Sequence, residues 1–238
     1  MPQPIAYQAD GLEMIGQLFA PSGGGARAGV LVSHESPGLA DHTRSIAARL
    51  ADLGYAALAV DYQGGGQVIA DREEMMRRFA TYMADPSIIR RRMEAALAAL
   101  RSSPGVEGRK IAAIGYCYGG TASLELARGG ADIQAVVGFH CGLGTARPQD
   151  AANIKAPILV QIGADDPVVP PDQRQGFEQE MNAAKVDWRM SVFSGTSHSF
   201  TNPEAETWGM PGFAYNRLSD ERAWRAMIDM FDETLGSS

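Results

Sequence analysis

The hexapeptide Gly115-Tyr116-Cys117-Tyr118-Gly119-Gly120 stands between an apolar run, residues 110–115, and a helical pattern, residues 121–127. A Gly-x-Cys-x-Gly string in this position is typical of a sharp strand-to-helix turn that exposes the central side chain at the end of a sheet. Small residues two places before and after relieve the crowding of such a turn. The following helix directs its amino end at the thiol, which favours negative charge there. Cys117 is therefore a candidate nucleophile, and the backbone N–H of Tyr118 a candidate donor to an oxyanion.

Apolar runs with strand and helix patterns continue on both sides of this turn. We expect strands at residues 29–34, 56–60, 110–115, 135–139, 158–163 and 187–193, and helices at residues 46–53, 71–100 with a break at Asp85-Pro86, 121–127, 172–184 and 218–235. This alternation predicts an α/β fold with a mainly parallel, twisted sheet that has helices on both faces. Residues 5–19 are expected to add an antiparallel hairpin at one edge. No Pro/Ser linker interrupts the pattern, so residues 1–238 are predicted to form a single domain.

Composition excludes several classes of function. The 238 residues contain 21 Lys and Arg against 28 Asp and Glu, which gives a net charge of −7, so nucleic-acid binding is not expected. The basic run Arg90-Arg91-Arg92 lies in a helical pattern and is predicted to form a solvated face. No apolar run approaches the roughly 20 residues that cross a bilayer, so membrane association is not expected either.

The cysteines and the first residues indicate the expected compartment. The two cysteines, Cys117 and Cys141, cannot build a disulfide scaffold and form no Cys-x-x-Cys motif. Cys141 is predicted to be structural, and no metal is expected. The first four residues, Met1-Pro2-Gln3-Pro4, do not begin a signal peptide, so a cytoplasmic protein is the expectation.

Two further segments carry groups that can act with a nucleophile. Asp165 and Asp166 follow the apolar run 158–163, and His198 lies in a Gly/Ser/Thr loop after the run 187–193. The carboxyl ends of parallel strands meet at one edge of a sheet, which is where ligands of such sheets bind. Either aspartate can hold an imidazole in the tautomer that accepts a proton from a nucleophile. The chain order of nucleophile, acid and histidine is that of the α/β-hydrolases.

With these segments the chain resembles the dienelactone hydrolase family of the α/β-hydrolase superfamily. The shared motifs are Gly115–Gly120, Asp-x-x-Val-Pro at Asp166–Pro170, Gly-x-x-His-Ser-Phe at Gly195–Phe200, Ser33–Leu39 and Asp61-Tyr62. The resemblance implies that Cys117, His198 and Asp166 form a triad that hydrolyses small esters or lactones through a thioester. It selects Asp166, because that residue stands three places before Val169-Pro170. It implies no metal or organic cofactor.

The resemblance also assigns roles around the triad. Glu35 is expected near the resting thiol, which its charge would keep neutral, and Ser36 is expected to give the second oxyanion N–H. Tyr62 and Arg72 are expected substrate-binding residues, with Arg77 and Arg78 as other candidates for a family arginine that precedes the turn. Trp208 is a further candidate from the residues themselves, because the aromatic- and glycine-rich segment 208–215 either walls the pocket or covers the core. His34 and His42 are expected to be structural or at the rim. A second family arginine follows the His-Ser-Phe motif, but this chain continues Thr201-Asn202-Pro203. An ester or lactone other than dienelactone is therefore at least as plausible.

Alternatives remain open at this point. A peptidase or thioesterase can use the same scaffold, because one fold hosts many reactions. A non-enzymatic protein can also keep the pocket for ligand binding or for redox sensing by Cys117. The expected partner is a small-molecule ester or lactone, and the expected assembly is a monomer or a small homo-oligomer.

Overall fold

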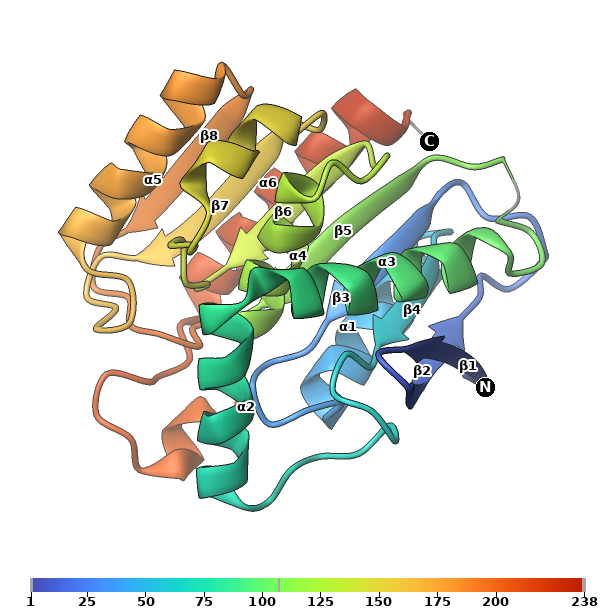
Figure 1. Ribbon diagram of the computed structural model, residues 1–238, viewed down its shortest axis with the longest axis horizontal. Coiled ribbons are helices and arrows are strands. Elements are labelled where there is room, and N and C mark those ends of the chain that lie inside the picture. Colours follow the sequence, from blue (N-terminus) through green and yellow to red (C-terminus); the bar gives the residue numbers. More distant parts are fainter. Residues whose placement is uncertain (1, 107, 237–238) are drawn as a thin grey trace.

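The computed structural model describes residues 2–106 and 108–236 (Figure 1). Its strands are β1 (Gln3–Ala9), β2 (Leu12–Phe19), β3 (Gly29–Ser33), β4 (Ala56–Val60), β5 (Ile111–Tyr116), β6 (Ala135–Phe139), β7 (Ile158–Gly163) and β8 (Trp188–Phe193). Its helices are α1 (Asp41–Asp52), α2 (Arg72–Ala84), α3 (Pro86–Arg101), α4 (Tyr118–Arg128), α5 (Pro171–Ala184) and α6 (Arg217–Leu235), with short 3₁₀ helices η1 (Pro148–Asn153) and η2 (Ala205–Trp208).

The strands form one sheet in the order β1-β2-β4-β3-β5-β6-β7-β8. Strands β3 to β8 pair in parallel, while β1 and β2 form an antiparallel hairpin whose second strand pairs antiparallel with β4. The predicted hairpin at one edge and the mainly parallel sheet are both confirmed. All parallel strands point their carboxyl ends to the same edge, which therefore collects the loops that follow them.

Helices cover both faces of the sheet. Helices α3, α4 and α5 pack on one face, and α1 and α6 pack on the other, where α6 is the red helix behind the sheet in Figure 1. Strand β3 shows how one strand serves both layers. Leu31 belongs to the apolar layer with α3 and α4, whereas Val30 and Val32 belong to the layer with α1 and α6. Burial on both faces explains why the central strands read as continuous apolar runs rather than alternating ones.

Two helices begin earlier than their sequence patterns predict. Helix α1 begins at Asp41 rather than at Ile46, and α4 begins at Tyr118 rather than at Thr121. The first turn of α4 contains Gly119 and Gly120. Glycine has a low helix propensity, so the sequence pattern did not indicate that the helix begins there. The predicted break at Asp85-Pro86 is confirmed, because Asp85 ends α2 and caps α3 by accepting a hydrogen bond from the Ser87 N–H.

The prediction that Arg90, Arg91 and Arg92 form a solvated face is wrong for two of the three. Arg92 is 7% exposed and donates hydrogen bonds to the Tyr62 carbonyl and the Tyr82 hydroxyl. Arg90 forms ion pairs with acidic residues of α4 and η1. Only Arg91 lies mostly in solvent. Paired guanidinium groups can be buried where isolated ones cannot, and helical periodicity does not show which arginines find partners.

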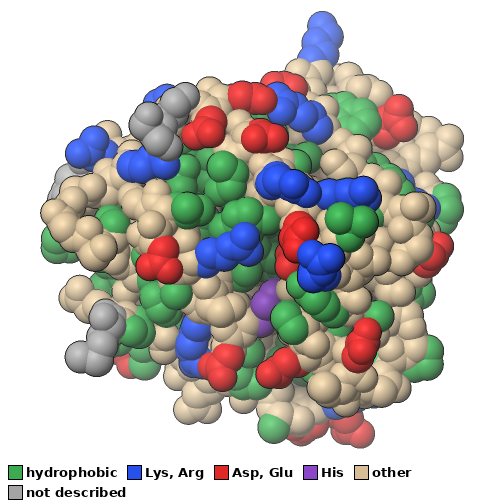
Figure 2. All heavy atoms as spheres, turned by 180° about the vertical axis from the view of Figure 1, so that it is seen from behind, with side chains coloured by type: hydrophobic (Ala, Val, Ile, Leu, Met, Phe, Trp, Pro, Cys, Tyr) green, Lys and Arg blue, Asp and Glu red, His purple; other side chains and the backbone are tan. Residues whose placement is uncertain are grey.

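Charge on the surface is mixed. Figure 2 shows basic and acidic side chains interspersed with apolar ones over the back of the molecule. This distribution agrees with the net charge of −7 and offers no continuous basic field on that face. Within the described part of the chain, no helix is long and apolar enough to cross a membrane.

Candidate active site

Cys117 lies on a strained turn between β5 and α4. Its φ of 51° and ψ of −123° fall in a region that residues with a side chain rarely adopt. The turn is held by close packing of two glycines. A Cβ on Gly115 would lie 2.1 Å from the Gly119 carbonyl oxygen, and a Cβ on Gly119 would lie 2.2 Å from the Ser33 carbonyl oxygen. The predicted strand–turn–helix context of Cys117 is therefore present, with the half-buried thiol at the helix amino end.

Asp166 and His198 meet at the same edge of the sheet. Asp166 follows β7, His198 follows β8, and Asp166 Oδ2 lies 2.8 Å from His198 Nδ1. The other carboxylate oxygen, Oδ1, accepts the N–H of Val168 at 2.8 Å, which fixes the carboxylate. Asp165 is exposed, and its backbone N–H donates a hydrogen bond to the Thr196 carbonyl. Its side chain has no hydrogen-bond partner within the described part of the chain. The geometry thus pairs the imidazole with Asp166 and not with Asp165.

The surroundings of His198 favour its protonated form. Burial lowers the pKa of His198, but the charge interaction with Cys117 and the hydrogen bond to Asp166 outweigh burial and raise the pKa to about 10. Its Nε2 has no nitrogen or oxygen partner among the described residues. With Nδ1 held by Asp166, Nε2 is the atom that can exchange a proton with the Cys117 thiol.

This environment predicts the titration of His198. Because its pKa is raised, we expect the imidazole signals of His198 in NMR spectra to remain those of the protonated form at pH 8, whereas an ordinary histidine is mostly neutral there. In a Cys117→Ala variant the midpoint should move toward lower pH, because Cys117 is the main cause that raises it. A midpoint below pH 7 in the wild type, or one that Cys117→Ala leaves unchanged, would contradict this assignment.

Two backbone N–H groups, those of Ser36 and Tyr118, are the expected oxyanion donors. The N–H of Tyr118 is the first of α4, so no turn precedes it to supply an acceptor. The N–H of Ser36 lies in the loop after β3. Neither N–H is a donor in the backbone hydrogen bonds of the turns, loops and caps among the described residues. The Ser36 carbonyl accepts a hydrogen bond of 2.6 Å from the Gln63 amide, which holds this part of the loop.

Glu35 is buried at the same edge of the sheet, where polar side chains of other segments hold its carboxylate. Its carboxylate accepts hydrogen bonds from Asn202 Nδ2 at 2.9 Å and from the Ser199 hydroxyl at 3.4 Å, and lies 3.4 Å from His42 Nδ1. Burial raises the pKa of Glu35, but His42 and Asn202 outweigh it and lower the pKa below its usual value. No hydrogen bond joins Glu35 to Cys117 within residues 2–106 and 108–236. The expected contact with the thiol therefore stays a prediction.

Tyr62 lies behind the loop that carries Glu35. It is fully buried, its hydroxyl donates to the His34 carbonyl at 2.8 Å, and its ring stacks on His34 with the centroids 3.8 Å apart. This placement favours a role in positioning the loop over contact with substrate. Asp61, just before it, accepts four backbone N–H bonds and so shapes the turn at residues 61–66.

The other expected substrate-binding residues lie farther out. Arg72 is exposed at the first turn of α2, and Trp208 is 40% exposed on η2. Residues 208–215 pack on the histidine loop. The His198 N–H donates to the Gly212 carbonyl at 2.9 Å, and the Phe213 ring meets the imidazole edge-on with the centroids 4.8 Å apart. Trp208 contacts Phe213 in turn, so this segment forms a wall on one side of His198.

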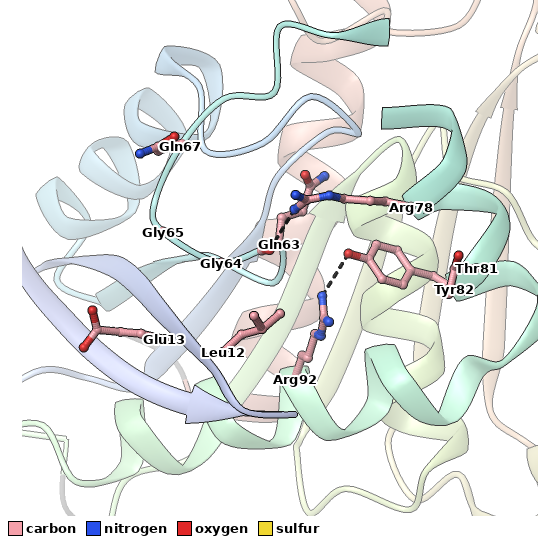
Figure 3. A pocket seen from close by; sticks show the side chains of 10 residues that line it. All are labelled: Leu12, Glu13, Gln63, Gly64, Gly65, Gln67, Arg78, Thr81, Tyr82 and Arg92. Atoms are coloured by element: carbon pink, nitrogen blue, oxygen red, sulfur yellow. Dashed lines mark hydrogen bonds between the residues drawn. The ribbon is translucent and has the colours of Figure 1, made fainter. Parts of the chain in front are cut away.

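A hollow of about 450 Å³ lies beside this site rather than in it (Figure 3). Its lining comes from the start of β2, the turn after β4, α2 and α3, and consists of Leu12, Glu13, Gln63, Gly64, Gly65, Gln67, Arg78, Thr81, Tyr82 and Arg92. Arg78 donates to the Gln63 carbonyl at 3.0 Å, and Arg92 donates to the Tyr82 hydroxyl at 2.8 Å. Neither Cys117 nor His198 lines it.

Sequence reasoning missed His140 as a member of this site. The residue follows β6, its side chain is fully buried, and its ring lies 5.0 Å from the ring of His198. Its place directly after a central strand was the only signal in the sequence. Cys141, next to it, packs fully buried beneath the turn, as its predicted structural role requires. Within the described residues, no group of three or more His, Cys, Asp or Glu side chains is arranged to hold a metal ion.

The chain is similar to known proteins along almost its whole length. A family profile described as "Dienelactone hydrolase family" matches residues 14–235. A solved dienelactone hydrolase-like promiscuous phosphotriesterase from metagenomic libraries is 41% identical, with a TM-score of 0.92 and 98% of each chain covered.

Two curated bacterial relatives are more distant. A protein of Aquifex aeolicus named "Putative carboxymethylenebutenolidase" is 26% identical, over 97% of this chain and 98% of its own. A protein of a Bradyrhizobium species named "Probable 2-oxo-3-(5-oxofuran-2-ylidene)propanoate lactonase" is 24% identical, over 90% of this chain and 87% of its own. The similarity thus extends over almost the whole chain in each case.

Proposed function

This chain belongs to the dienelactone hydrolase family, and from that premise we propose that it hydrolyses small carboxylic esters or lactones with Cys117 as nucleophile. The observation that carries the proposal is the pairing of His198 with Asp166 at 2.8 Å, at the edge of the sheet that presents Cys117 on its strained turn. A nucleophile, a base and an acid that orients the base are the three parts that acyl transfer requires.

The proposed reaction proceeds in two halves. The Cys117 sulfur attacks the carbonyl carbon with its proton already held on His198 Nε2, because the raised pKa of His198 favours the protonated imidazole. The carbonyl oxygen becomes an oxyanion that accepts hydrogen bonds from the N–H groups of Ser36 and Tyr118. The C–O bond then breaks, and His198 returns the proton to the leaving alkoxide. A water molecule, deprotonated by His198, attacks the resulting thioester and releases the acid. Asp166 keeps the Nδ1 proton of His198 in place throughout.

We propose that the substrate does not need a carboxylate. The segment after His198 supplies Asn202, whose amide donates to Glu35, and it supplies no arginine up to Arg217. An anionic substrate would also meet the buried Glu35 carboxylate at this edge. Neutral esters and lactones avoid that repulsion.

A phosphotriester is a second candidate substrate. The relative that is 41% identical over 98% of each chain is described as a promiscuous phosphotriesterase. A neutral phosphotriester offers an electrophilic centre with a P=O oxygen, which the same N–H groups could hold as charge develops. A neutral phosphotriester, like a neutral ester or lactone, is not repelled by the Glu35 carboxylate.

A substrate panel with trapping of the intermediate tests the proposal. Wild-type protein should hydrolyse p-nitrophenyl acetate and simple γ- and δ-lactones, with a dienelactone as the anionic comparison and diethyl p-nitrophenyl phosphate as the phosphotriester. Acid quenching during turnover of the acetate, followed by peptide mass spectrometry, should find the acetyl group on Cys117 and not on Cys141. Turnover of none of these compounds, or acetylation at another residue, would overturn the proposal.

The role proposed for Glu35 predicts a change in thiol reactivity. A carboxylate near the sulfur disfavours a second negative charge, and the thiolate is the form that peroxide oxidises. We therefore expect Glu35→Gln to be inactivated by hydrogen peroxide several-fold faster than wild type at pH 7. Glu204→Gln, a change two residues after Asn202 on the surface, is the matched control and should behave as wild type. An unchanged or slower inactivation of Glu35→Gln would contradict the role.

A further inference from the structure

His140 is hydrogen-bonded to the backbone of the proposed nucleophile. The Cys117 N–H donates to His140 Nδ1 at 3.2 Å and shares its proton with the Phe139 carbonyl at 3.0 Å. The His140 backbone is itself in the left-handed region, with φ of 39°, and its N–H donates to the Gln161 carbonyl of β7. Cys117 and His140 both have strained backbones, lie at the ends of neighbouring strands and are hydrogen-bonded to each other.

The other ring nitrogen reaches the histidine loop. His140 Nε2 lies 2.9 Å from the Thr201 hydroxyl oxygen, three residues after His198. Because Nδ1 accepts the Cys117 N–H, a neutral ring carries its proton on Nε2, and Nε2 donates to Thr201. The Thr201 carbonyl lies 3.1 Å from His42 Nε2, and Asn202 holds Glu35, so this segment is anchored on both sides.

We propose that His140 is a positioning residue that sets the distance between Cys117 and His198 by bridging the turn of the one to the loop of the other. The bridge is a single rigid ring with one hydrogen bond to each side. An apolar side chain could fill the same volume. Without a hydrogen bond to each side, however, it could not fix the positions of the Cys117 turn and the His198 loop. The inference rests on the proposed function, because it concerns the same thiol and imidazole.

The surroundings keep His140 in the form that the bridge needs. Burial lowers the pKa of His140 well below its ordinary value, and the charges of His198 and His42 lower it further. A protonated His140 would turn Nδ1 into a donor that faces the Cys117 N–H. The ring is also enclosed edge-on by His198 and Phe200, whose centroids lie 5.0 and 5.3 Å away, so it cannot turn freely.

Paired variants on each side of the bridge test the proposal. His140→Asn and His140→Gly both tolerate a positive φ, but only Asn offers an acceptor near the position of Nδ1. We expect His140→Gly to lower kcat for p-nitrophenyl acetate by about 10- to 100-fold with little change in KM, because misplacement of reacting groups costs about that much. His140→Asn should recover most of kcat.

On the loop side, Thr201→Val removes the hydroxyl and Thr201→Ser keeps it. The Thr201 backbone is not left-handed, unlike that of His140. Thr201→Val should lower kcat by about fivefold, the value of one hydrogen bond of about 1 kcal/mol, and Thr201→Ser should not. The matched control is Thr196→Val, which removes a buried hydroxyl of the same loop that bonds Ser219 of α6 at 2.8 Å and also bonds the Ser194 carbonyl and the Asn216 amide. Its kcat should stay within about twofold of wild type.

The outcomes separate this inference from the proposed function. If Cys117→Ala is inactive and the variants follow the pattern above, with circular dichroism spectra like wild type, the bridge is established. If Cys117→Ala is inactive but Thr201→Val keeps full kcat, or His140→Asn loses as much kcat as His140→Gly, the bridge is wrong and the nucleophile stands. If Cys117→Ala remains active, the proposed function is wrong, and the inference about His140 that rests on it is wrong as well.

Discussion

Cys117→Ala is expected to lower the turnover of p-nitrophenyl acetate by at least about 10³-fold, because removing the nucleophile from a triad leaves only binding and the oxyanion donors. The structure gives no second thiol that could substitute. Cys141 is fully buried, and burial raises the pKa of its thiol to about 12, so it is a poor nucleophile in addition to being inaccessible.

The matched control is Cys141→Ala, which should keep its turnover. Iodoacetamide should label Cys117 in the wild type and in Cys141→Ala, with loss of activity in step with labelling, and should not label Cys141 in folded Cys117→Ala. Mass spectrometry of the labelled peptides and the rate of nitrophenol release measure both. Turnover that survives in Cys117→Ala would exclude Cys117 as nucleophile and would favour a binding or sensor role for the site.

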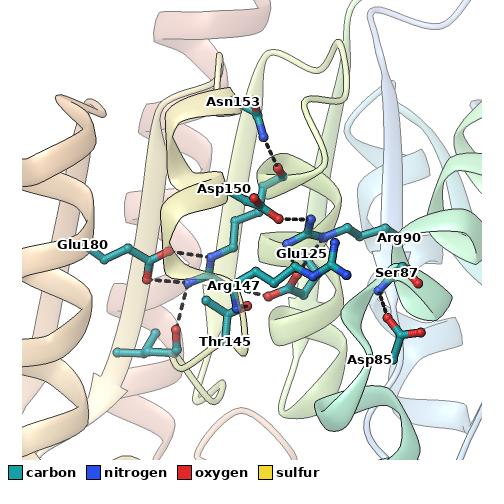
Figure 4. Close-up of polar contacts among 11 residues, drawn as sticks. Asp85, Ser87, Arg90, Glu125, Thr145, Arg147, Asp150, Asn153 and Glu180 are labelled. Atoms are coloured by element: carbon teal, nitrogen blue, oxygen red, sulfur yellow. Dashed lines mark hydrogen bonds and ion pairs between the residues drawn. The ribbon is translucent and has the colours of Figure 1, made fainter.

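Arg128→Leu is expected to lower the free energy of unfolding by about 3–5 kcal/mol, the largest effect on stability that we predict. The Arg128 side chain is fully buried, and it forms a bidentate pair with Glu180 of α5 through bonds of 2.7 and 2.8 Å. It also pairs with Glu125 of α4 at 3.0 Å and donates to the Leu143 carbonyl. Arg90 and Asp150 extend this cluster to α3 and η1 (Figure 4).

The expected loss of stability comes from the buried carboxylates that lose their hydrogen bonds from Arg128. Without Arg128, the Glu180 carboxylate loses two donors and Glu125 loses one, while both stay buried. For a chain of this size the loss corresponds to a fall in Tm of roughly 10 °C. Thermal and urea unfolding followed by circular dichroism measure it.

Two further variants make this result interpretable. Arg217→Leu removes an exposed arginine that pairs with Glu221 within α6, and should change stability by less than about 0.5 kcal/mol. Adding Glu180→Leu to Arg128→Leu should recover part of the loss, because it removes the carboxylate that is left unpaired, whereas Glu125 keeps Arg90 as a partner. A double variant less stable than Arg128→Leu would show that packing, rather than unpaired charge, accounts for the loss.

Much of the candidate site was predictable because each motif is local. Cys117, Asp166 and His198 each follow a strand with a strong apolar pattern, and parallel strands bring their carboxyl ends together whatever the details of packing. The choice between Asp165 and Asp166 was different. Residue type and position do not separate these neighbours. The family motif selects Asp166, and the 2.8 Å contact between Asp166 and His198 agrees with that choice.

Local sequence patterns were enough to predict the sheet, its helices and the sharp turn at Cys117, because those follow from side-chain periodicity and from glycines that permit backbone contacts within a few residues. Which polar groups meet depends on long-range packing. The burial of Arg92, the hold of Asn202 on Glu35 and the bridge from Cys117 through His140 to Thr201 all join segments that are far apart along the chain. Their partners depend on how loops pack over the sheet edge, and no local period in the sequence records that packing.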